Sequence, residues 1–379
     1  MRFEFVTATR IIFGEGTAAG LPELAHTFGT RPMVVTGASP ERARPLVLAL
    51  SAETFAVAGE PTVDLVREGV RRVHQTGCDV VISMGGGSAI DAGKAIATIA
   101  TNGGEPLDFL EVVGKGRAIA EAPLPYIAVP TTAGTGSEVT RNAVLGSPEN
   151  GVKASLRSPL MLARAAVVDP ELTYELPPAV TARTGLDALT QLIEPMVSIR
   201  MNPLTDSICM EGLRRVARGL RRAWRDGADR DARRDMSLAS LFGGLALANA
   251  GLGAVHGFAG PLGGTWKAPH GSLCAALLPH CMAANLAAMR AREPHHPALE
   301  RYAVIARILT GRGDASAGDG IVWVRELCAD LKVPPLRAWG IAEADLPGVV
   351  EKAARASSMK ANPLPLTGQE LLAVLAAAL

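Results

Sequence analysis

Five short apolar segments recur through the first half of the chain, and helix-like stretches separate them. The apolar segments, each of which predicts a strand, are 32–36, 53–58, 79–84, 125–129 and 165–168. The stretches between them predict helices at about 40–50, 62–76 and 88–101, with Thr62 and Ser88 as N-cap residues. Strands that alternate with helices in this way predict βαβ units around a parallel sheet.

A proline pair, Pro177-Pro178, divides the chain into two parts of different character. Before it, the segments 140–146 and 152–157 flank Glu149-Asn150-Gly151 and predict a β-hairpin. After it, the apolar pattern predicts helices alone. We therefore expect an α/β domain over residues 1–177 and an all-helical domain over residues 178–379.

Composition excludes several classes of protein. The formal net charge is +1, which favours neither nucleic acid nor an anionic membrane as a partner. The five cysteines form no CxxC pair and predict reduced thiols in a cytoplasmic protein. The N-terminal residues lack the apolar run of a signal peptide. No apolar stretch is expected to reach the ~18 residues that span a bilayer.

A glycine turn at residues 85–88 ends one apolar segment and opens a helix. Glycines let backbone amides approach a pyrophosphate, the helix N-terminus adds partial positive charge, and Ser88 adds a hydroxyl group. Taken alone, this turn fits a structural role equally well. Hydroxyl groups in the later segment 130–138 favour a ligand site, because open α/β sheets bind ligands where strands end. The hydroxyl residues are Thr131, Thr132, Thr135 and Ser137.

Four polar residues in the second half are candidates for one pocket. Asp187 and Gln191 are four residues apart in a helical pattern, so both project from one helix face. His256 follows a glycine-rich approach, and His270 lies between Pro269 and Gly271. One carboxylate, one amide and two imidazoles suit a divalent first-row metal. The alternative is that Asp187 has a structural role and the histidines are ordinary pocket residues.

The order of these motifs resembles that of the iron-containing (group III) alcohol dehydrogenase family over almost the whole chain. The motifs are FGEG (13–16), SMGGGSAIDAGKAIA (83–97), PTTAGTGSE (130–138), GLDALTQLIEP (185–195) and the two histidine segments within 251–271. The resemblance implies that Gly85, Gly86, Gly87 and Ser88, with the hydroxyl residues of 130–138, clasp a nicotinamide cofactor. It also implies that Asp91 lies near the nicotinamide and that Lys153 reaches the cofactor ribose.

The resemblance further implies a metal, iron or zinc, held by one aspartate and three histidines. The corresponding residues here are Asp187, Gln191, His256 and His270, so a glutamine replaces one histidine. A second departure is Gly260, where many members carry a histidine near the substrate. An amide oxygen is a weaker donor than imidazole toward these metals. Without a metal, His256 or His270 would donate the hydrogen bond or proton to the substrate oxygen.

Cofactor choice should depend on the end of the second apolar segment. A carboxylate there binds the ribose 2′-hydroxyl of NAD and repels a 2′-phosphate. This chain has Thr36-Gly37-Ala38-Ser39, with Arg42 and Arg44 close behind. Gly37 removes the repulsion, and Ser39 with an arginine would bind a phosphate, so we expect NADP to be preferred over NAD. The alternative is that both arginines are solvent-facing helix residues.

Two other patterns have simpler explanations. The basic segment 213–234 has apolar residues at helical spacing, which predicts a solvated helix rather than a nucleic-acid arm. Cys274 and Cys281 lie near His270 and His280 in sequence, but residues ten and eleven apart on one helix do not converge. We therefore expect both cysteines to be buried core residues.

These patterns predict an NAD(P)-dependent oxidoreductase that interconverts a small alcohol and its aldehyde or ketone. Hydride transfer is expected in the cleft between the domains, with a divalent metal polarising the substrate oxygen and with His256 and His270 as catalytic residues. The resemblance implies a homo-oligomer, with a dimer as the expected form.

Three alternatives to this function remain. One is a metal-independent oxo-acid reductase resembling the maleylacetate reductase branch, although that branch tends to lack an aspartate where this chain has Asp91. Another is a relative of the dehydroquinate and sugar-phosphate cyclases, which would need more basic residues near 181–271. A non-catalytic binding protein is suggested only by the two replaced histidines.

Overall fold

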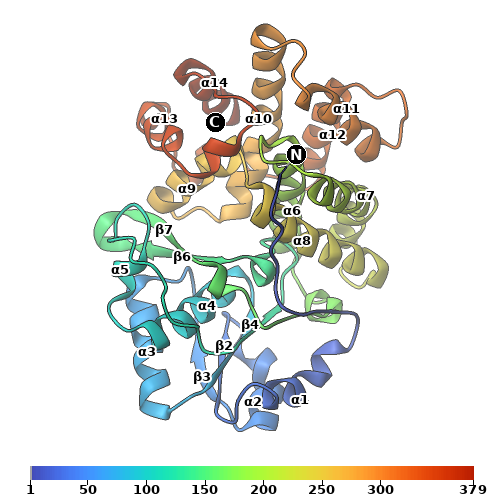
Figure 1. Cartoon of the computed structure of the whole chain (residues 1–379). Helices are drawn as coiled ribbons and strands as arrows, with labels where there is room; N and C mark the ends of the chain where they lie inside the picture. The colour runs from blue at the N-terminus through green and yellow to red at the C-terminus, as the bar shows by residue number, and fades with distance from the viewer. Residues whose placement is uncertain (1) are drawn as a thin grey trace. The chain divides into compact units, whose positions relative to one another are not determined.

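The computed structural model describes residues 2–379, which form two compact units. The α/β unit contains residues 6–132 and 136–173. The helical unit contains residues 174–379, together with the chain start up to Phe5 and the short segment Ala133–Thr135. In Figure 1 the α/β unit runs from blue to green and the helical unit from green to red. The functional division at residues 177 and 178 stays a prediction.

The α/β unit is built on a six-stranded parallel sheet with the order β1-β8-β5-β4-β2-β3. Its central strands are buried along their whole length, as strands covered on both faces must be, and this explains their uninterrupted apolar sequences. The strands are β1 (Ile11–Phe13), β2 (Pro32–Thr36), β3 (Glu53–Ala56), β4 (Val80–Gly85), β5 (Tyr126–Pro130) and β8 (Ala165–Val168). The predicted parallel sheet is confirmed, and β1 is a sixth strand that the five apolar segments did not include.

The helices of this unit follow the predicted alternation. They are α1 (Leu21–His26), α2 (Arg44–Leu50), α3 (Val63–Thr76), α4 (Gly87–Asn102) and α5 (Pro106–Phe109). Thr62 caps α3 as expected, because its side chain accepts a hydrogen bond from the Leu65 amide. The prediction that Ser88 caps α4 was wrong. Gly86 is the N-cap residue, and Ser88 already lies inside the first turn.

The predicted hairpin is confirmed. Strands β6 (Asn142–Ser147) and β7 (Val152–Arg157) pair antiparallel outside the main sheet. The connection ends at Gly151, whose φ of 60° lies in the left-handed region that glycine adopts without strain.

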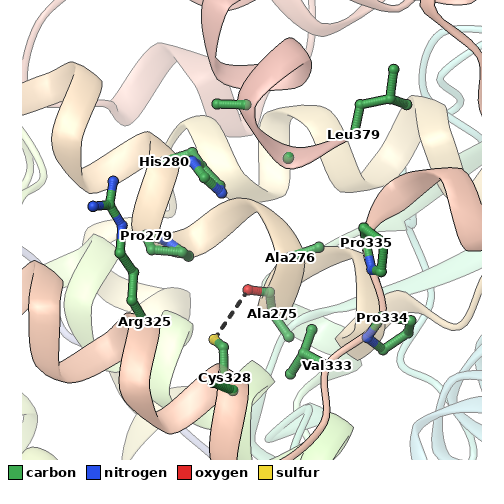
Figure 2. Close-up of a pocket in the computed structure, with 13 residues that line it drawn as sticks. Ala275, Ala276, Pro279, His280, Arg325, Cys328, Val333, Pro334, Pro335 and Leu379 are labelled. Carbon is green, nitrogen blue, oxygen red and sulfur yellow. Dashed lines mark hydrogen bonds between the residues drawn. The ribbon is translucent and has the colours of Figure 1, made fainter.

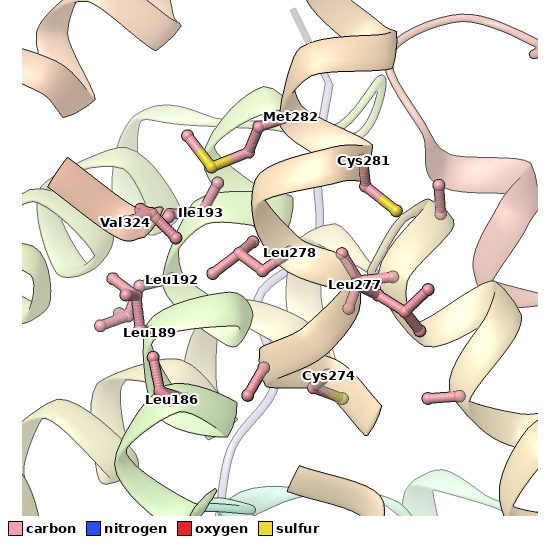
Figure 3. Packing of buried hydrophobic residues seen from close by; sticks show 14 of the residues in the cluster. Leu186, Leu189, Leu192, Ile193, Cys274, Leu277, Leu278, Cys281, Met282 and Val324 are labelled. Carbon is pink, nitrogen blue, oxygen red and sulfur yellow. The ribbon is translucent and has the colours of Figure 1, made fainter. Parts of the chain in front are cut away.

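The helical unit contains nine α-helices among the described residues. They are α6 (Pro178–Val197), α7 (Pro203–Arg225), α8 (Arg230–Ala250), α9 (Ala254–Trp266), α10 (His270–Arg292), α11 (Ala298–Thr310), α12 (Ala317–Asp330), α13 (Leu346–Ala354) and α14 (Gly368–Ala378). Figure 3 shows the core between α6 and α10, where Leu189 and Leu192 face Leu278. The basic segment 213–234 forms the end of α7 and the start of α8, and Arg218 there pairs with Asp235.

Three helices of this unit carry a proline in their interior. These prolines are Pro195 in α6, Pro261 in α9 and Pro279 in α10. Proline lacks the amide that would donate to the carbonyl four residues earlier, so each helix has one incomplete turn. In α10 the carbonyl concerned is that of Ala275, and it accepts a hydrogen bond from the thiol of Cys328 at 3.5 Å.

One expectation about apolar stretches was wrong. Helix α10 is long and apolar enough to cross a membrane by length and composition, and the bent pair of α8 and α9 passes the same test together. However, 72% of the apolar stretch of α10 is buried inside the protein. Its leucines pack against α6, so α10 serves as a core helix of this unit.

Candidate metal centre and cofactor site

Three helices of the helical unit bring four potential metal-binding side chains together. Asp187 comes from α6, His256 from α9, and His270 and Cys274 from α10. One ligand atom from each lies within 4.8 Å of the others, and we call this group the aspartate cluster. The predicted convergence of Asp187, His256 and His270 therefore occurs.

Glu194 orients one imidazole of the cluster. Its Oε2 lies 2.6 Å from Nδ1 of His256, and its Oε1 accepts a hydrogen bond of 2.7 Å from the Val255 amide. A carboxylate on Nδ1 leaves the lone pair of Nε2 directed at the cluster, as is common for histidines that bind metals. Sequence reasoning missed Glu194, although it lies seven residues after Asp187, or two helical turns along the same face.

A close contact between helices positions the second imidazole. His270 is the first residue of α10, and a Cβ at the next residue, Gly271, would stand 2.2 Å from the carbonyl oxygen of Arg183 in α6. Only glycine permits this approach. The helix then places Cys274 one turn beyond His270, so both side chains point to the same face.

One oxygen of the cluster, and another from a neighbouring turn of α6, have unused hydrogen-bonding capacity. Among the described residues, the buried atoms Asp187 Oδ1 and Gln191 Oε1 have no hydrogen-bond partner. Asp187 Oδ1 lies 3.5 Å from His256 Nε2 and 3.8 Å from His270 Nε2. Buried polar atoms without a partner are costly and rare in proteins. A carboxylate, two imidazoles and a thiol around such atoms fit a divalent cation.

Charges inside the cluster shift its pKa values in a consistent direction. Burial would lower the pKa of both histidines, but Cys274 together with Glu194 raises the pKa of His256 well above its ordinary value. Cys274 and Asp187 similarly raise the pKa of His270 to about 9. Burial would raise the pKa of Asp187, but His270 and His256 lower it. Protons and a cation therefore compete for the same side chains.

The two residues that replace histidines lie on the same helices. Gln191 is buried on α6 one turn after Asp187, with its side-chain oxygen unsatisfied as described. Gly260 lies on α9 one turn after His256, and a Cβ there would have no neighbour within 4 Å. The prediction that Cys274 is only a core residue was incomplete. It is buried, but its sulfur lies 3.6 Å from His270 Nε2 and 3.9 Å from His256 Nε2.

In the α/β unit, the carboxyl ends of adjacent strands bring the predicted glycines together. A Cβ at Gly37, which follows β2, would lie 3.8 Å from Gly85 and 3.9 Å from the amide nitrogen of Gly86. A Cβ at Gly86 would lie 3.4 Å from the Thr132 side chain. We call Gly37, Gly85, Gly86, Gly87 and Thr132 the glycine edge. Backbone without side chains beside the start of α4 fits a dinucleotide pyrophosphate.

The other predicted cofactor residues occupy varied positions. Ser88 lies in the first turn of α4, and Thr131 continues β5, where its amide donates to the Gly85 carbonyl at 2.9 Å. Ser39 is exposed before the short helix Pro40–Ala43, and Arg44 is exposed at the start of α2. Thr135 belongs to the helical unit. Lys153 on β7 forms an ion pair of 3.1 Å with Glu60.

The half-buried Asp91 and the buried Ser137 lie in a second polar group, which sequence reasoning did not identify. The ammonium group of Lys94 donates to the carbonyl oxygens of Ser137, Thr140 and Asn142 and to the Thr140 hydroxyl, at 2.7–3.0 Å. Asp91 accepts from the Val144 amide at 3.1 Å. We call Lys94, Asp91 and Glu138, with these partners, the lysine cluster.

Burial is the main cause of the pKa shifts in the lysine cluster. It lowers the pKa of Lys94 to about 8, although Asp91 and Glu138 oppose the shift. It raises the pKa of Asp91 to about 6 and that of Glu138 to about 7. The cluster thus holds both acidic and basic groups whose charges change near neutral pH.

A separate pocket lies beside the incomplete turn of α10 (Figure 2). Pro279, His280, Arg325 and Cys328 line it, and the hydrogen bond from Cys328 to Ala275 crosses its wall. Its volume is about 270 Å³. None of the residues of the aspartate cluster lines this pocket. Among the described residues, the group of potential ligands around His270 contains Cys274 but neither His280 nor Cys281.

Comparison with known proteins gives consistent matches along the chain. Residues 8–170 match the profile of the iron-containing alcohol dehydrogenases, and residues 181–379 match the profile of the C-terminal region of the same family. The chain is 38% identical to a 1,3-propanediol dehydrogenase of Klebsiella pneumoniae, over 82% of this chain and 78% of that protein. It is 36% identical to alcohol dehydrogenase 4 of Saccharomyces cerevisiae, over 83% of this chain and 80% of the yeast protein. Among solved structures, a 1,3-propanediol oxidoreductase superposes with a TM-score of 0.90 at 34% identity and covers 100% of both chains.

Proposed function

The chain belongs to the iron-containing alcohol dehydrogenase family and interconverts an alcohol with its aldehyde or ketone, and from that premise we propose which residues perform each step. The aspartate cluster binds a divalent cation, and the glycine edge binds the pyrophosphate of NAD(P). The observation that carries this assignment is the buried oxygen Asp187 Oδ1 of this cluster, which lacks any hydrogen bond within the described part of the chain.

The glycine edge positions the cofactor. When bound, the nicotinamide supplies the hydride for reduction or accepts it in oxidation. The first amides of α4 have no preceding turn to bond, so they are available to phosphate oxygens. The hydroxyls of Ser88 and Thr132 lie in and beside this turn and add donors. In this proposal the lysine cluster fixes the position of α4 and therefore of the glycine turn at its start, because Lys94 hydrogen-bonds the segment 137–142.

The aspartate cluster positions the substrate oxygen. When bound, a divalent cation supplies a Lewis acid toward that oxygen. Glu194 holds the proton of His256 on Nδ1 and thereby keeps Nε2 directed at the cluster. The side chain of His270 is 37% exposed, so it can exchange a proton with solvent while it contacts the buried Asp187. We assign His256 to binding and orientation, and His270 to binding and proton exchange.

Cofactor preference follows from the residue after β2. Gly37 supplies no carboxylate against a 2′-phosphate, and the exposed Ser39 and Arg44 lie in the next turn of chain. These features favour NADP over NAD. A solved relative, the sulfoacetaldehyde reductase of Bifidobacterium kashiwanohense, was crystallised with NAD+ at 29% identity to this chain, so use of both cofactors is compatible with the fold.

The metal-independent alternative is not favoured. A reductase that uses histidine alone would have no need for buried Asp187 and Gln191 oxygens without partners. The family resemblance suggests a homodimer, which light scattering of the purified chain will test. The five free cysteines support a reducing, cytoplasmic location.

The decisive experiment measures NADPH and NADH oxidation with a panel of aldehydes, ketones and oxo-acids, before and after zinc or ferrous iron is added to chelator-treated enzyme. We expect aldehyde reduction that requires the added metal. Asp187→Asn should abolish it, while Asp330→Asn, a surface exchange on α12, should retain it. Oxo-acid reduction that needs no metal would establish the alternative mechanism, and no turnover of any carbonyl would overturn the proposal.

A further inference from the structure

The geometry points to Cys274 as the fourth protein ligand of the aspartate cluster, which makes it a carboxylate, bis-imidazole and thiolate site that favours zinc. This inference rests on the proposed function only in taking the cluster as a metal site. It replaces the amide of Gln191, the residue that sequence position suggests, with a sulfur from another helix.

Four distances within the cluster lie within about 0.4 Å of those in a tetrahedral zinc site. Bonds of about 2.0–2.1 Å to nitrogen and oxygen and about 2.3 Å to sulfur place ligand atoms about 3.4 Å (N to O) and about 3.6 Å (N to S) apart. Asp187 Oδ1 lies 3.5 and 3.8 Å from the two imidazole Nε2 atoms. Cys274 Sγ lies 3.6 and 3.9 Å from the same two atoms. The sulfur thus completes the arrangement that the other three groups begin.

The surroundings of Cys274 differ from those of an ordinary core cysteine. It is fully buried, yet two imidazoles and a carboxylate face its sulfur. Cys274 and Cys281 are both buried and both belong to the apolar core shown in Figure 3, but only Cys274 also lies within the aspartate cluster. The unsatisfied Asp187 oxygen supplies the independent sign that a ligand belongs between these groups.

Charge and position both favour Cys274 over Gln191 as the fourth ligand. A neutral amide at residue 191 weakens the site toward first-row metals, whereas a thiolate is a strong ligand for zinc and a poor one for manganese. His270 and Cys274 are four residues apart on one helix, the same spacing that joins Asp187 to Gln191 on α6. Four protein ligands fill a tetrahedral site, so a substrate oxygen would have to bind as a fifth ligand, on the side where the partly exposed His270 meets solvent.

Cobalt substitution tests the sulfur directly, independent of catalysis. Chelator-treated enzyme under reducing, oxygen-free conditions is titrated with Co2+, and the absorption spectrum is recorded. We expect a thiolate-to-cobalt charge-transfer band in the near ultraviolet with intense visible bands of tetrahedral cobalt. Cys274→Ser and Cys274→Ala should lose the charge-transfer band, and the matched control Cys281→Ala should keep it.

Metal affinity provides the second measurement, by competition with a chromophoric chelator. We expect Cys274→Ser to weaken zinc binding at least about 10-fold and to change manganese binding much less. Gln191→His in the Cys274→Ser background should recover zinc affinity without restoring the charge-transfer band.

Two results would overturn the assignment. One is a wild-type cobalt spectrum without the thiolate band, which decides the matter even where a variant fails to fold. The other is a band that persists in a folded Cys274→Ser protein. Neither result bears on carbonyl reduction itself, so failure of this inference and failure of the proposed function are distinguishable.

Discussion

The two buried polar groups of this protein differ in how their hydrogen bonds are satisfied. In the lysine cluster, the protein supplies every partner of the ammonium group, with four acceptors of Lys94 at 2.7–3.0 Å. In the aspartate cluster, the atoms that face one another stand 3.5–3.9 Å apart, and Asp187 Oδ1 has no hydrogen bond among the described residues. The first group is satisfied by the protein itself, whereas the second brings four potential ligands together and leaves Asp187 Oδ1 unsatisfied among the described residues.

This difference helps to distinguish a buried polar cluster with a structural role from one that is a candidate ligand site. Both clusters contain buried carboxylates and a basic group, and both shift pKa values. Cys274 Sγ lies at hydrogen-bond distance from both imidazoles of the aspartate cluster, so the clusters differ in the buried oxygen Asp187 Oδ1, which has no partner among the described residues. Separations of about 3.4–3.6 Å between good ligands are also those across a metal ion.

Removal of the ammonium group should have the largest effect on stability. Lys94→Met leaves three carbonyl groups, Asp91 and Glu138 without their cation, and loss of one partner from a buried charged network costs about 3–5 kcal/mol. Chemical denaturation monitored by circular dichroism will measure it. Lys115→Met is the control, because the Lys115 side chain is 81% exposed and its loss should change stability by less than about 0.5 kcal/mol. A Lys94 variant as stable as wild type would show that the lysine cluster is not structural.

The aspartate cluster should respond to metal instead. Zinc at 100 times its dissociation constant should raise the unfolding free energy by about 2.7 kcal/mol. Asp187→Asn should remove this stabilisation, because an amide is a poor substitute for the carboxylate ligand. Glu138→Gln, which changes a buried acid of the other cluster, should retain it. Thermal unfolding with and without zinc is the measurement, and equal stabilisation of both variants would contradict the comparison.

The pH dependence of stability should report the lysine cluster. Burial raises the pKa of Glu138 to about 7 from an ordinary value of 4.5, so the folded state binds more protons than the unfolded state between these values. Its contribution to stability is therefore complete below pH 4.5 and falls as pH rises toward 7. Glu138→Gln should remove this fall, so its stability relative to wild type should be about 2 kcal/mol greater at pH 8 than at pH 5. Urea unfolding at both pH values tests this, and a constant difference would refute the assignment.

The smallest predicted effect concerns the glycine edge, which lies in the same α/β unit as the lysine cluster but shares no residue with it. A Cβ at Gly37 has its nearest neighbours at 3.8 and 3.9 Å, so a side chain fits there. Gly37→Asp should lower kcat/KM for NADPH about tenfold relative to NADH, or ~1.4 kcal/mol, through repulsion of the 2′-phosphate. Gly37→Asn, of the same size without charge, should not discriminate between the cofactors. A wild-type enzyme that prefers NADH tenfold would contradict our interpretation of this turn.

The parts of the fold that depend on local sequence were predictable. The uninterrupted apolar strands, the Thr62 cap and the hairpin at Gly151 follow from hydrophobic pattern and turn chemistry. The end of β4 was less predictable, because sheet pairing extends the strand to Gly85 and moves the helix cap to Gly86. That shift depends on a neighbouring strand, which no local pattern records.

The site was predicted in part. The four-residue spacing of Asp187 and Gln191 correctly placed both on one buried helix face. The same spacing applied to His270 would have identified Cys274. The role of Glu194 depends on its hydrogen bonds to Val255 and His256 of α9, and the lysine cluster depends on the bonds from Lys94 of α4 to the segment 137–142. Such contacts join residues far apart in sequence, so periodicity alone does not reveal them.

The interior prolines described above affect how stiff the ligand-bearing turns are. Pro195, Pro261 and Pro279 withhold a hydrogen bond from the carbonyls four residues earlier, which belong to Gln191, Gly257 and Ala275. Gly257 and Ala275 directly adjoin His256 and Cys274 of the aspartate cluster, and Gln191 lies one turn after Asp187. Helices bend most readily at such turns. The helices that carry the proposed ligands can therefore bend near the ligand side chains. Such bending would accommodate a metal–sulfur bond, which is longer than a metal–nitrogen bond, without strain elsewhere in the core.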